Sequence, residues 1–253
     1  MRIVLFTSGV AINGSFGSTE VQDYLCSTEK LPLIVADPPY GQIVSDEWDN
    51  YTQESLCSEL IKWSGCAQEL LISGGSFYVW GGIGKYKSRA FFKYLSTVEQ
   101  ETSLQMRNLI SWGKRRAYGK KDDYLFTREE CAWFVAHQEK PTIFNIPLLE
   151  TKRGYAGFNA KYPAKSEFYR RTNIWTDVNE IFRGKLHVAH KPEKLAEIMI
   201  STHTNEGMTV LDPFAGSGST AVAAINLKRK YIVIEKDEEI FNKMCERLKR
   251  LDT

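Results

Sequence analysis

The chain has only five cysteines, and they are scattered rather than paired as CxxC. It has four histidines, and no cluster of histidine and cysteine has the spacing of a zinc site. These absences argue against a structural metal and against a domain held together by disulfides. No apolar run approaches the roughly 20 residues of a membrane-spanning helix, and residues 3–6 are too short for a signal-peptide core. We therefore expect a cytoplasmic protein with reduced thiols, no metal and no membrane association.

The sequence also lacks a strong net charge, but its charges are unevenly distributed. The net charge is +2, whereas residues 114–185 carry 15 Lys and Arg against 9 Asp and Glu. The remainder holds 18 basic and 22 acidic residues, so a basic middle adjoins an acidic remainder. One basic face suits a polyanion such as nucleic acid, although a solvated basic loop explains the same excess equally well.

Short apolar runs alternate with helical patterns along most of the chain. This alternation is typical of an α/β fold, in which helices wrap a mostly parallel sheet. The expected strands are residues 3–6, 33–36, 76–80, 109–112, 131–136, 209–211 and 231–234. The expected helices are residues 54–71, 85–98, 192–202, 219–227 and 238–249. The pattern thus predicts one sheet of about seven strands.

Residues 141–185 break this rhythm with prolines, glycines and aromatic residues interleaved with lysines and arginines. Aromatic rings stack on bases and cations contact phosphates, so the composition suits nucleic acid. Aromatic residues in an irregular segment also commonly pack that segment onto the protein body. The segment is therefore predicted to be an insertion, and its pattern alone leaves both interpretations open.

Residues 33–44 read LIVADPPYGQIV, an apolar strand that ends on Asp37, two prolines and Tyr40. If this strand lies in the parallel sheet, its carboxyl end faces the crevice where ligands bind. A carboxylate, a carbonyl and an aromatic face together form a receptor for a flat heterocycle that bears an amino group. Asp37 and the Pro38 carbonyl would accept the two amine hydrogens, and Tyr40 would stack on the ring.

Residues 209–224 read TVLDPFAGSGSTAVAA, in which a glycine-rich turn joins a strand to a helix. Glycines allow close approach of the backbone to a ligand, and a helix N-terminus favours an anionic group. Glu235 ends the next strand, 19 residues after Gly216, where a carboxylate accepts hydrogen bonds from ribose hydroxyls. The stretch also satisfies the dinucleotide pattern G-x-G-x-x-G/A, but too little chain follows it to hold a second nucleotide. A nucleoside-containing cofactor is the better prediction.

The order of three motifs resembles that of the β group of DNA amino-methyltransferases, which use S-adenosylmethionine. DPPY comes first, residues 187–192 (HVAHKP) are similar to the HPxxKP segment of that group, and FAGSG comes last. Val188 and His190 depart from the commoner proline and glutamine, and Gly14-Ser15 stands where the group often has Gly-Asp. The resemblance implies an α/β fold with a circularly permuted, Rossmann-like methyltransferase sheet and a target-recognition insertion. It spans about residues 34–248.

The resemblance also implies roles for individual residues. The catalytic residues would be Asp37, Pro38, Pro39 and Tyr40. The S-adenosylmethionine-binding residues would be Asp37, His187, Lys191, Pro192, Asp212, Phe214, Ala215, Gly216, Ser217, Gly218, Ser219, Thr220 and Glu235. The nucleic-acid-binding residues, chosen for their charge, would be Lys114, Arg115, Arg116, Lys120, Lys152, Arg153, Arg170 and Arg171. No metal is implied.

The implied organisation has three parts and double-stranded DNA as the partner. Residues 1–140 would form the catalytic half, residues 141–186 the target-recognition insertion and residues 187–253 the cofactor-binding half. Members of this group occur alone, on phages or beside a cognate restriction enzyme, and homodimers are common, so we expect a bacterial or phage protein at the nucleoid. The target base would be flipped out of the duplex, with loops 41–51 and 113–124 closing on the DNA.

Several functions stay open at this point. Transfer to adenine N6 is favoured over cytosine N4 because aspartate rather than serine precedes the two prolines. An RNA methyltransferase fits less well. A non-catalytic nucleic-acid-binding subunit with the same fold is a further alternative, which the intact Asp37 and glycine loop argue against.

Overall fold

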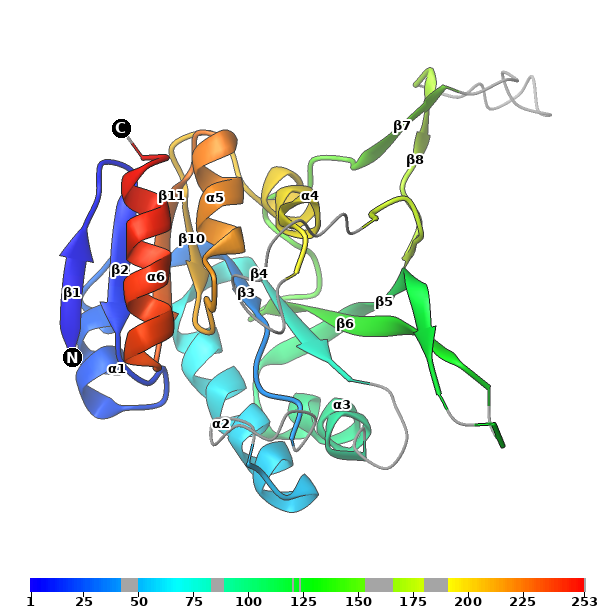
Figure 1. Cartoon of the computed structure of the whole chain (residues 1–253), viewed down its shortest axis with the longest axis horizontal. Coiled ribbons are helices and arrows are strands. Elements are labelled where there is room, and N and C mark those ends of the chain that lie inside the picture. The colour runs from blue at the N-terminus through cyan, green and yellow to red at the C-terminus, as the bar shows by residue number, and fades with distance from the viewer. Residues whose placement is uncertain are drawn as a thin grey trace.

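The computed structural model describes residues 1–41, 50–82, 89–119, 121–122, 124–152, 166–179 and 191–252. In these ranges the chain forms a nine-stranded sheet with helices on both faces, and a separate two-stranded hairpin (Figure 1). The strands are β1 (Arg2–Leu5), β2 (Gly9–Asn13), β3 (Leu31–Ala36), β4 (Leu71–Gly81), β5 (Leu104–Tyr118), β6 (Phe126–Ala136), β7 (Leu148–Lys152), β8 (Phe168–Arg170), β9 (Ile174–Trp175), β10 (Thr209–Asp212) and β11 (Lys230–Glu235). The helices are α1 (Thr19–Cys26), α2 (Gln53–Leu70), α3 (Arg89–Glu101), α4 (Glu193–His203), α5 (Ser219–Asn226) and α6 (Glu238–Lys249).

The strand order inserts the last two strands of the chain, β10 and β11, between β2 and β3. The order is β1-β2-β11-β10-β3-β4-β6-β5-β9. Strands β2, β11, β10, β3 and β4 pair in parallel, and β6 runs antiparallel between β4 and β5. Seven strands from β2 to β5 form the body of the sheet, and β1 and β9 extend its edges. The predicted fold class, a permuted and mostly parallel Rossmann-like sheet, is confirmed.

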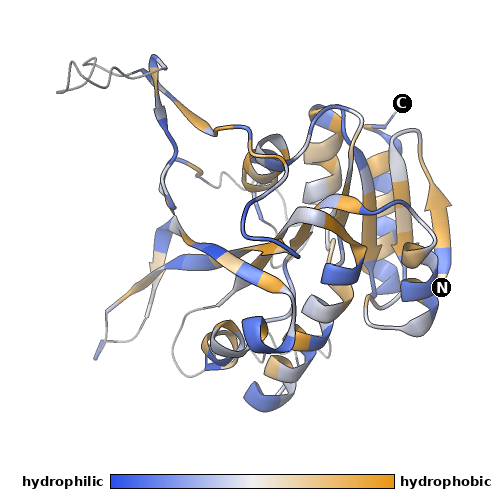
Figure 2. Cartoon of the chain, turned by 180° about the vertical axis from the view of Figure 1, so that it is seen from behind, coloured by the Kyte–Doolittle hydropathy of each residue, from blue (hydrophilic) through white to orange (hydrophobic). Residues whose placement is uncertain are grey.

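Alternate residues of each central strand face opposite helical layers, as the two-residue period of a strand requires. Leu33 and Val35 of β3 pack with residues of α4, α5 and α6. Ile34 and Ala36 of the same strand pack with residues of α1, α2 and α3. Because both faces are covered, the strands read as continuous apolar runs rather than alternating ones. Figure 2 shows these orange runs in the interior of the body, with blue residues toward the outer surfaces.

The predicted helices agree with the structure within a few residues, and side chains fix two of their starts. Thr52 caps α2 by accepting a hydrogen bond from the backbone N–H of Ser55, and Asp237 caps α6 in the same way at Ile240. Helix α3 begins at Arg89, and residues 85–88 of its predicted range lie outside the described residues. The short elements α1, β2, β7, β8 and β9 were not predicted.

The chain leaves β3 and β10 in opposite directions. After β10, α5 leads to β11 on one side, and after β3, α2 leads to β4 on the other. Open α/β sheets bind ligands at such a switch point, in the crevice outside the carboxyl ends of the strands. The two motif-bearing turns, residues 37–40 and 212–218, follow these two strands directly.

Two hairpins extend beyond the body of the protein. Strands β5 and β6 continue past their neighbours as one hairpin, and β7 and β8 form a second that points away from the sheet (Figure 1). The described residues of segment 141–186 contain β7, β8 and β9, of which β9 returns to pair with β5. The three-part division of the chain stays a prediction. In the described ranges, no helix has the length and apolar character that crossing a membrane requires.

Candidate active site

Neighbouring parallel strands bring the two motifs together. Residues Leu33 and Ile34 of β3 pair with Val210 and Leu211 of β10. Each strand is followed at once by an Asp-Pro turn, which starts at Asp37 after β3 and at Asp212, the last residue of β10. The carboxyl ends of both strands lie at the same edge, so the turns flank one crevice, as the sequence predicted.

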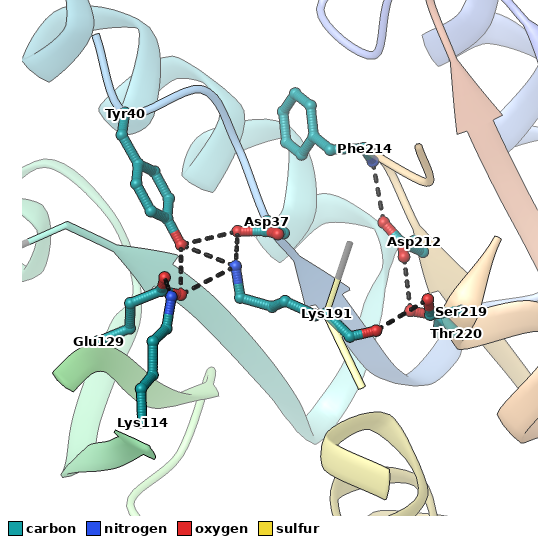
Figure 3. Close-up of polar contacts among 9 residues, drawn as sticks. All are labelled: Asp37, Tyr40, Lys114, Glu129, Lys191, Asp212, Phe214, Ser219 and Thr220. Atoms are coloured by element: carbon teal, nitrogen blue, oxygen red, sulfur yellow. Dashed lines mark hydrogen bonds and ion pairs between the residues drawn. The ribbon is translucent and has the colours of Figure 1, made fainter. Parts of the chain in front are cut away.

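At the first turn, the side chains of Asp37 and Tyr40 meet the ammonium group of Lys191 (Figure 3). Lys191 Nζ lies 2.6 Å from Asp37 Oδ1 and donates to the Tyr40 hydroxyl at 2.8 Å. The Tyr40 hydroxyl donates in turn to Asp37 Oδ1 at 2.9 Å. Lys191 was predicted to lie beside the cofactor, and Tyr40 was predicted to stack on a base. The structure adds a direct contact of both side chains with Asp37.

A second carboxylate, Glu129 of β6, completes this cluster and was missed by the sequence analysis. Glu129 Oε2 lies 3.2 Å from Lys191 Nζ and 3.4 Å from the Tyr40 hydroxyl. Its other oxygen, Oε1, accepts a hydrogen bond from Lys114 of β5. The doublet Glu129-Glu130 at the start of an apolar strand was the available signal, because acidic residues there need partners when the strand is buried.

The ionisation of the cluster follows from its burial and its paired charges. Burial alone would lower the pKa of Lys191, but the carboxylates of Asp37 and Glu129 outweigh it and raise that pKa. Burial alone would raise the pKa of Glu129, but Lys191 and Lys114 outweigh it and lower that pKa. Burial, followed by the nearby carboxylates of Asp37 and Glu129, raises the pKa of Tyr40 well above its ordinary value. The cluster therefore holds a charged lysine, a charged glutamate and a neutral tyrosine at neutral pH.

The second turn carries the glycine loop between β10 and α5. Gly216 and Gly218 have φ angles of 51° and 81°, in the left-handed region that favours glycine. A Cβ atom added at Gly216 would meet no atom within 4 Å, so the backbone there faces open space. A Cβ atom at Gly218 would lie 2.9 Å from Met244 Cγ, where α6 packs under the loop. The loop therefore packs against α6 at Gly218 and leaves its backbone accessible at Gly216.

Asp212 holds the shape of this loop from inside. It accepts hydrogen bonds from the backbone N–H of Phe214 at 2.9 Å and from Thr220 Oγ1 at 2.5 Å. Burial raises the pKa of Asp212 to about 7, against the opposing effect of these two bonds. Asp212 is therefore a structural acid whose bonds join the start of the loop to the first turn of α5.

Glu235, at the end of β11, lies beside the same loop. Its Oε2 accepts the N–H of Gly216 at 2.8 Å, and its Oε1 accepts the N–H of Asp237 at 2.8 Å. Burial raises the pKa of Glu235. Each carboxylate oxygen has a further lone pair for a hydroxyl group, so the predicted ribose contact is compatible with these bonds.

Aromatic side chains line the approach to the loop. The ring of Phe214 packs edge-on against Trp63 of α2, with centroids 4.8 Å apart, and against Phe16 at 6.1 Å. Phe16 brings the N-terminal segment 14–16 to the cofactor loop, although that segment lacks the Gly-Asp of the resembled group. Open backbone at Gly216, a carboxylate at Glu235 and an apolar ring at Phe214 together fit a nucleoside-bearing cofactor.

Lys191 connects the two turns, one through its side chain and the other through its backbone carbonyl (Figure 3). Its side chain joins Asp37, and its backbone carbonyl accepts a hydrogen bond from Ser219 Oγ at 3.0 Å, at the start of α5. Pro192 then precedes α4. His187 lies outside the described residues. Of the remaining predicted cofactor residues, Ala215 and Ser217 are buried in the loop, and Arg247 of α6 donates to the Ser217 carbonyl at 2.9 Å.

An apolar recess lies beside the DPPY turn. Its walls are formed by Pro38, Pro39, Tyr40, Leu56, Leu60, Trp80, Gly81, Gly82 and Phe91. These residues come from the turn itself, from β4 and its end, and from α2 and α3. The recess gives the turn the apolar surroundings that a flat aromatic ring requires.

The residues predicted to bind nucleic acid fall into different surroundings. Arg116, Lys152 and Arg170 are exposed on the two hairpins, and Arg115 is exposed with its Nε bonded to Asn179. Lys114 pairs with Glu129. The side chain of Arg171 is only 6% exposed and forms a bidentate ion pair with Asp177 at 2.6 and 2.8 Å, so it braces the segment. Lys120 and Arg153 lie outside the described residues.

Comparison with known proteins agrees with this geometry. Residues 31–246 match the N6/N4 DNA methylase family. The type II methyltransferase M.HpaI of Haemophilus parainfluenzae is 28% identical over 224 residues, which cover 86% of this chain and 68% of that protein.

Two solved structures share the fold. The PvuII DNA methyltransferase (cytosine-N4-specific) has a TM-score of 0.74 at 20% identity, over 95% of this chain and 86% of its own. The M1.HpyAVI–SAM complex has a TM-score of 0.63 at 24% identity, over 94% and 99%. The chain therefore belongs to the N6/N4 DNA methylase family, whose members are S-adenosylmethionine-dependent amino-methyltransferases of DNA.

Proposed function

We propose that this chain transfers a methyl group to the exocyclic N6 of a flipped adenine at a defined sequence of duplex DNA. The observation that carries the proposal is the state of Asp37. Its Oδ1 is held by Tyr40 and Lys191, and within the described ranges no hydrogen bond or ion pair reaches its Oδ2. One oxygen of a fixed carboxylate is thus left for the target amine, one strand away from the cofactor loop.

Bound S-adenosylmethionine supplies a methyl group on a positively charged sulfur. Gly216, Gly218 and Glu235 would hold its nucleoside, with Phe214 against its ring. The chain's own part is to bind and orient the amine. Asp37 Oδ2 and the Pro38 carbonyl accept the two amine hydrogens, which draws the nitrogen lone pair out of conjugation with the base. Orientation at close range then supplies much of the rate, and no covalent bond between enzyme and base is needed.

A stacked base cannot enter this crevice, so the target nucleotide leaves the duplex before reaction. The ring of the flipped base would lie against the apolar side chains around Pro38 and Tyr40. The exposed cations Arg115 and Arg116 on the β5–β6 hairpin contact the phosphate backbone, and Lys152 and Arg170 do so on the second hairpin. We assign the reading of the target sequence to residues 141–186, because their described hairpin, β7–β8, points away from the sheet (Figure 1). The homodimer and the cognate restriction enzyme stay predictions.

Cytosine N4 is a second candidate target, favoured by the similarity to the cytosine-N4-specific PvuII enzyme. Adenine is preferred because aspartate, rather than serine, precedes the two prolines at position 37. Both bases present an amino group with two hydrogens, so the same contacts at Asp37 and Pro38 serve either reaction.

The test is transfer of labelled methyl groups from S-adenosylmethionine to duplex DNA by the wild type and by Asp37→Ala. Digestion to nucleosides and mass spectrometry then identify the product. We expect N6-methyladenine with the wild type and none with Asp37→Ala. N4-methylcytosine would establish the second candidate. A wild type that binds the cofactor but methylates no duplex, including DNA from cells that lack the protein, would contradict both.

A further inference from the structure

We infer that Glu129 is a positioning residue for methyl transfer, which acts through Lys191 to hold the Asp37 carboxylate in its working orientation. The inference rests on the proposed function, because it assigns Asp37 to the target amine. It adds a residue of β6 that lies 92 positions from Asp37 in the sequence and belongs to none of the motifs.

Lys191 is the side chain through which Glu129 acts on Asp37. Its Nζ contacts three oxygen atoms: Asp37 Oδ1 at 2.6 Å, the Tyr40 hydroxyl at 2.8 Å and Glu129 Oε2 at 3.2 Å. Asp37 and Tyr40 accept two of the three N–H donors of the ammonium group, and Glu129 adds a second carboxylate as an ion pair. The Lys191 side chain is only 15% exposed and that of Glu129 17%, so water is a poor substitute for either partner. Loss of Glu129 would remove one of the two carboxylates that compensate this largely buried positive charge.

The positive and negative charges of the cluster balance. Asp37 and Glu129 supply two carboxylates, and Lys191 and Lys114 supply two ammonium groups. The thiol of Cys131 lies behind them, and burial raises its pKa well above the ordinary value, so it stays neutral. Without Glu129, two cations would share one carboxylate, and Asp37 would be drawn toward both. Glu129 therefore compensates the charge of Lys114, so that Asp37 pairs with Lys191 alone.

An aspartate carboxylate needs bonded partners to keep one orientation. The terminal torsion of an aspartate is broad, so a carboxylate without partners rotates freely. Here Tyr40 and Lys191 both bind Oδ1, which fixes the plane of the group and directs Oδ2 away from the cluster. Lys191 in turn is fixed at its far side by Glu129, and Glu129 by Lys114 at its other oxygen. The chain of contacts runs from β5 through β6 to the turn after β3.

The test is a double-mutant cycle on the single-turnover rate at saturating cofactor and DNA. Glu129→Gln removes the charge and keeps the shape, and we expect about a tenfold loss of rate with unchanged cofactor affinity. Lys191→Gln should cost about 100-fold. The double variant should also cost about 100-fold, because Glu129 acts only through Lys191. Additive losses, about 1,000-fold in the double variant, would overturn the inference.

A matched control and a second readout keep the result specific. Glu206→Gln also removes one carboxylate and one ion pair, here an exposed one with Lys228, and should keep the wild-type rate. Crystal structures should show Lys191 withdrawn from Asp37, or the Asp37 carboxylate rotated, in Glu129→Gln. If Glu129→Gln folds poorly, Glu129→Asp serves instead, since its shorter side chain keeps the charge but withdraws it from Lys191.

The possible failures can be told apart. An active wild type with an equally active Glu129→Gln, or with the Asp37–Lys191 contact unchanged in that variant, would overturn the inference and leave the proposed function standing. A wild type that transfers no methyl group would overturn the proposed function, and the inference with it.

Discussion

The same dipeptide, Asp-Pro, follows two neighbouring strands of one sheet and meets two different environments. After β3, Asp37 is 26% exposed, pairs with the ammonium of Lys191 and has one oxygen without a partner in the described ranges. At the end of β10, Asp212 is buried and satisfied by a backbone N–H and a hydroxyl. The first arrangement presents a charged acceptor to a ligand, and the second holds a loop together. The different roles of Asp37 and Asp212 therefore follow from their surroundings rather than from the dipeptide that they share.

The largest expected effect comes from removing the charge at the first turn. Asp37→Asn keeps the size of the side chain but replaces an acceptor with a donor, so the target amine loses its charged partner. We expect the single-turnover rate of methyl transfer to fall about 10²- to 10³-fold. Calorimetric affinity for S-adenosylmethionine should change little. A large loss of cofactor affinity would mean that Asp37 belongs to the cofactor site instead.

The second prediction concerns pH and the buried Asp212. Its folded pKa of about 7 lies above the unfolded value near 3.8, so its stabilising contribution is complete below pH 3.8 and is lost as the pH rises to about 7. Asp212→Asn cannot ionise. Between pH 5 and 8 the unfolding free energy of the wild type should therefore fall relative to the variant, by about 2 kcal/mol.

Denaturant unfolding of the two proteins at several pH values measures this difference. Buried His203, bonded to Tyr78 and Ser76, has a pKa lowered by burial to about 4 and is common to both proteins. His203 lowers the unfolding free energy of both proteins as the pH falls from 6.5 toward 4, whereas Asp212 lowers that of the wild type as the pH rises. Because His203 acts equally on both proteins, the difference between their unfolding free energies reports on Asp212 alone. Parallel curves across pH 5–8 would show that Asp212 is ionised throughout.

The third prediction tests the open side of the cofactor loop. Gly216→Ala places a methyl group where the backbone faces open space, at a φ of 51° that alanine adopts at some cost. We expect the dissociation constant for S-adenosylmethionine to rise about tenfold, with duplex binding unchanged in gel-shift measurements. Equal loss of cofactor and DNA binding would indicate a general collapse of the loop instead.

The smallest effect is expected at Thr220, whose hydroxyl donates to Asp212. Thr220→Val keeps the volume and removes this bond, which should lower the unfolding free energy by about 1 kcal/mol. The pKa of Asp212 should rise further, because the bond to Thr220 lowers it. A carboxyl-labelled NMR titration measures the shift, and a lower midpoint than in the wild type would contradict the assigned contact.

The sequence was sufficient for the parts of the site that are contiguous in the chain. DPPY, the glycine loop and Glu235 each follow a strand, and parallel strands bring their ends to one edge, so their proximity was predictable. The permuted order of the sheet followed from the order of the motifs. Helix α6, which has a clear apolar face, was predicted with the bounds that the structure shows.

What the sequence could not supply were contacts between distant segments. Glu129 meets Lys191 only because β6 lies between β4 and β5, which a strand pattern alone does not reveal. The bond from the Tyr40 hydroxyl to Asp37 depends on the shape of the turn, so stacking was the only role that composition suggested. Arg171 looked like a phosphate ligand, but its partner Asp177 lies six residues away in an irregular segment without a period to follow.

The comparison between the two aspartates is tested most directly by one pair of rates. Single-turnover methyl transfer to the same duplex, at saturating cofactor and DNA, should be measured for Asp37→Asn and Asp212→Asn side by side. The account predicts a loss of about 10²- to 10³-fold for Asp37→Asn and a rate within about threefold of wild type for Asp212→Asn. Wild-type rates with Asp37→Asn, or an equal loss in both variants, would contradict it.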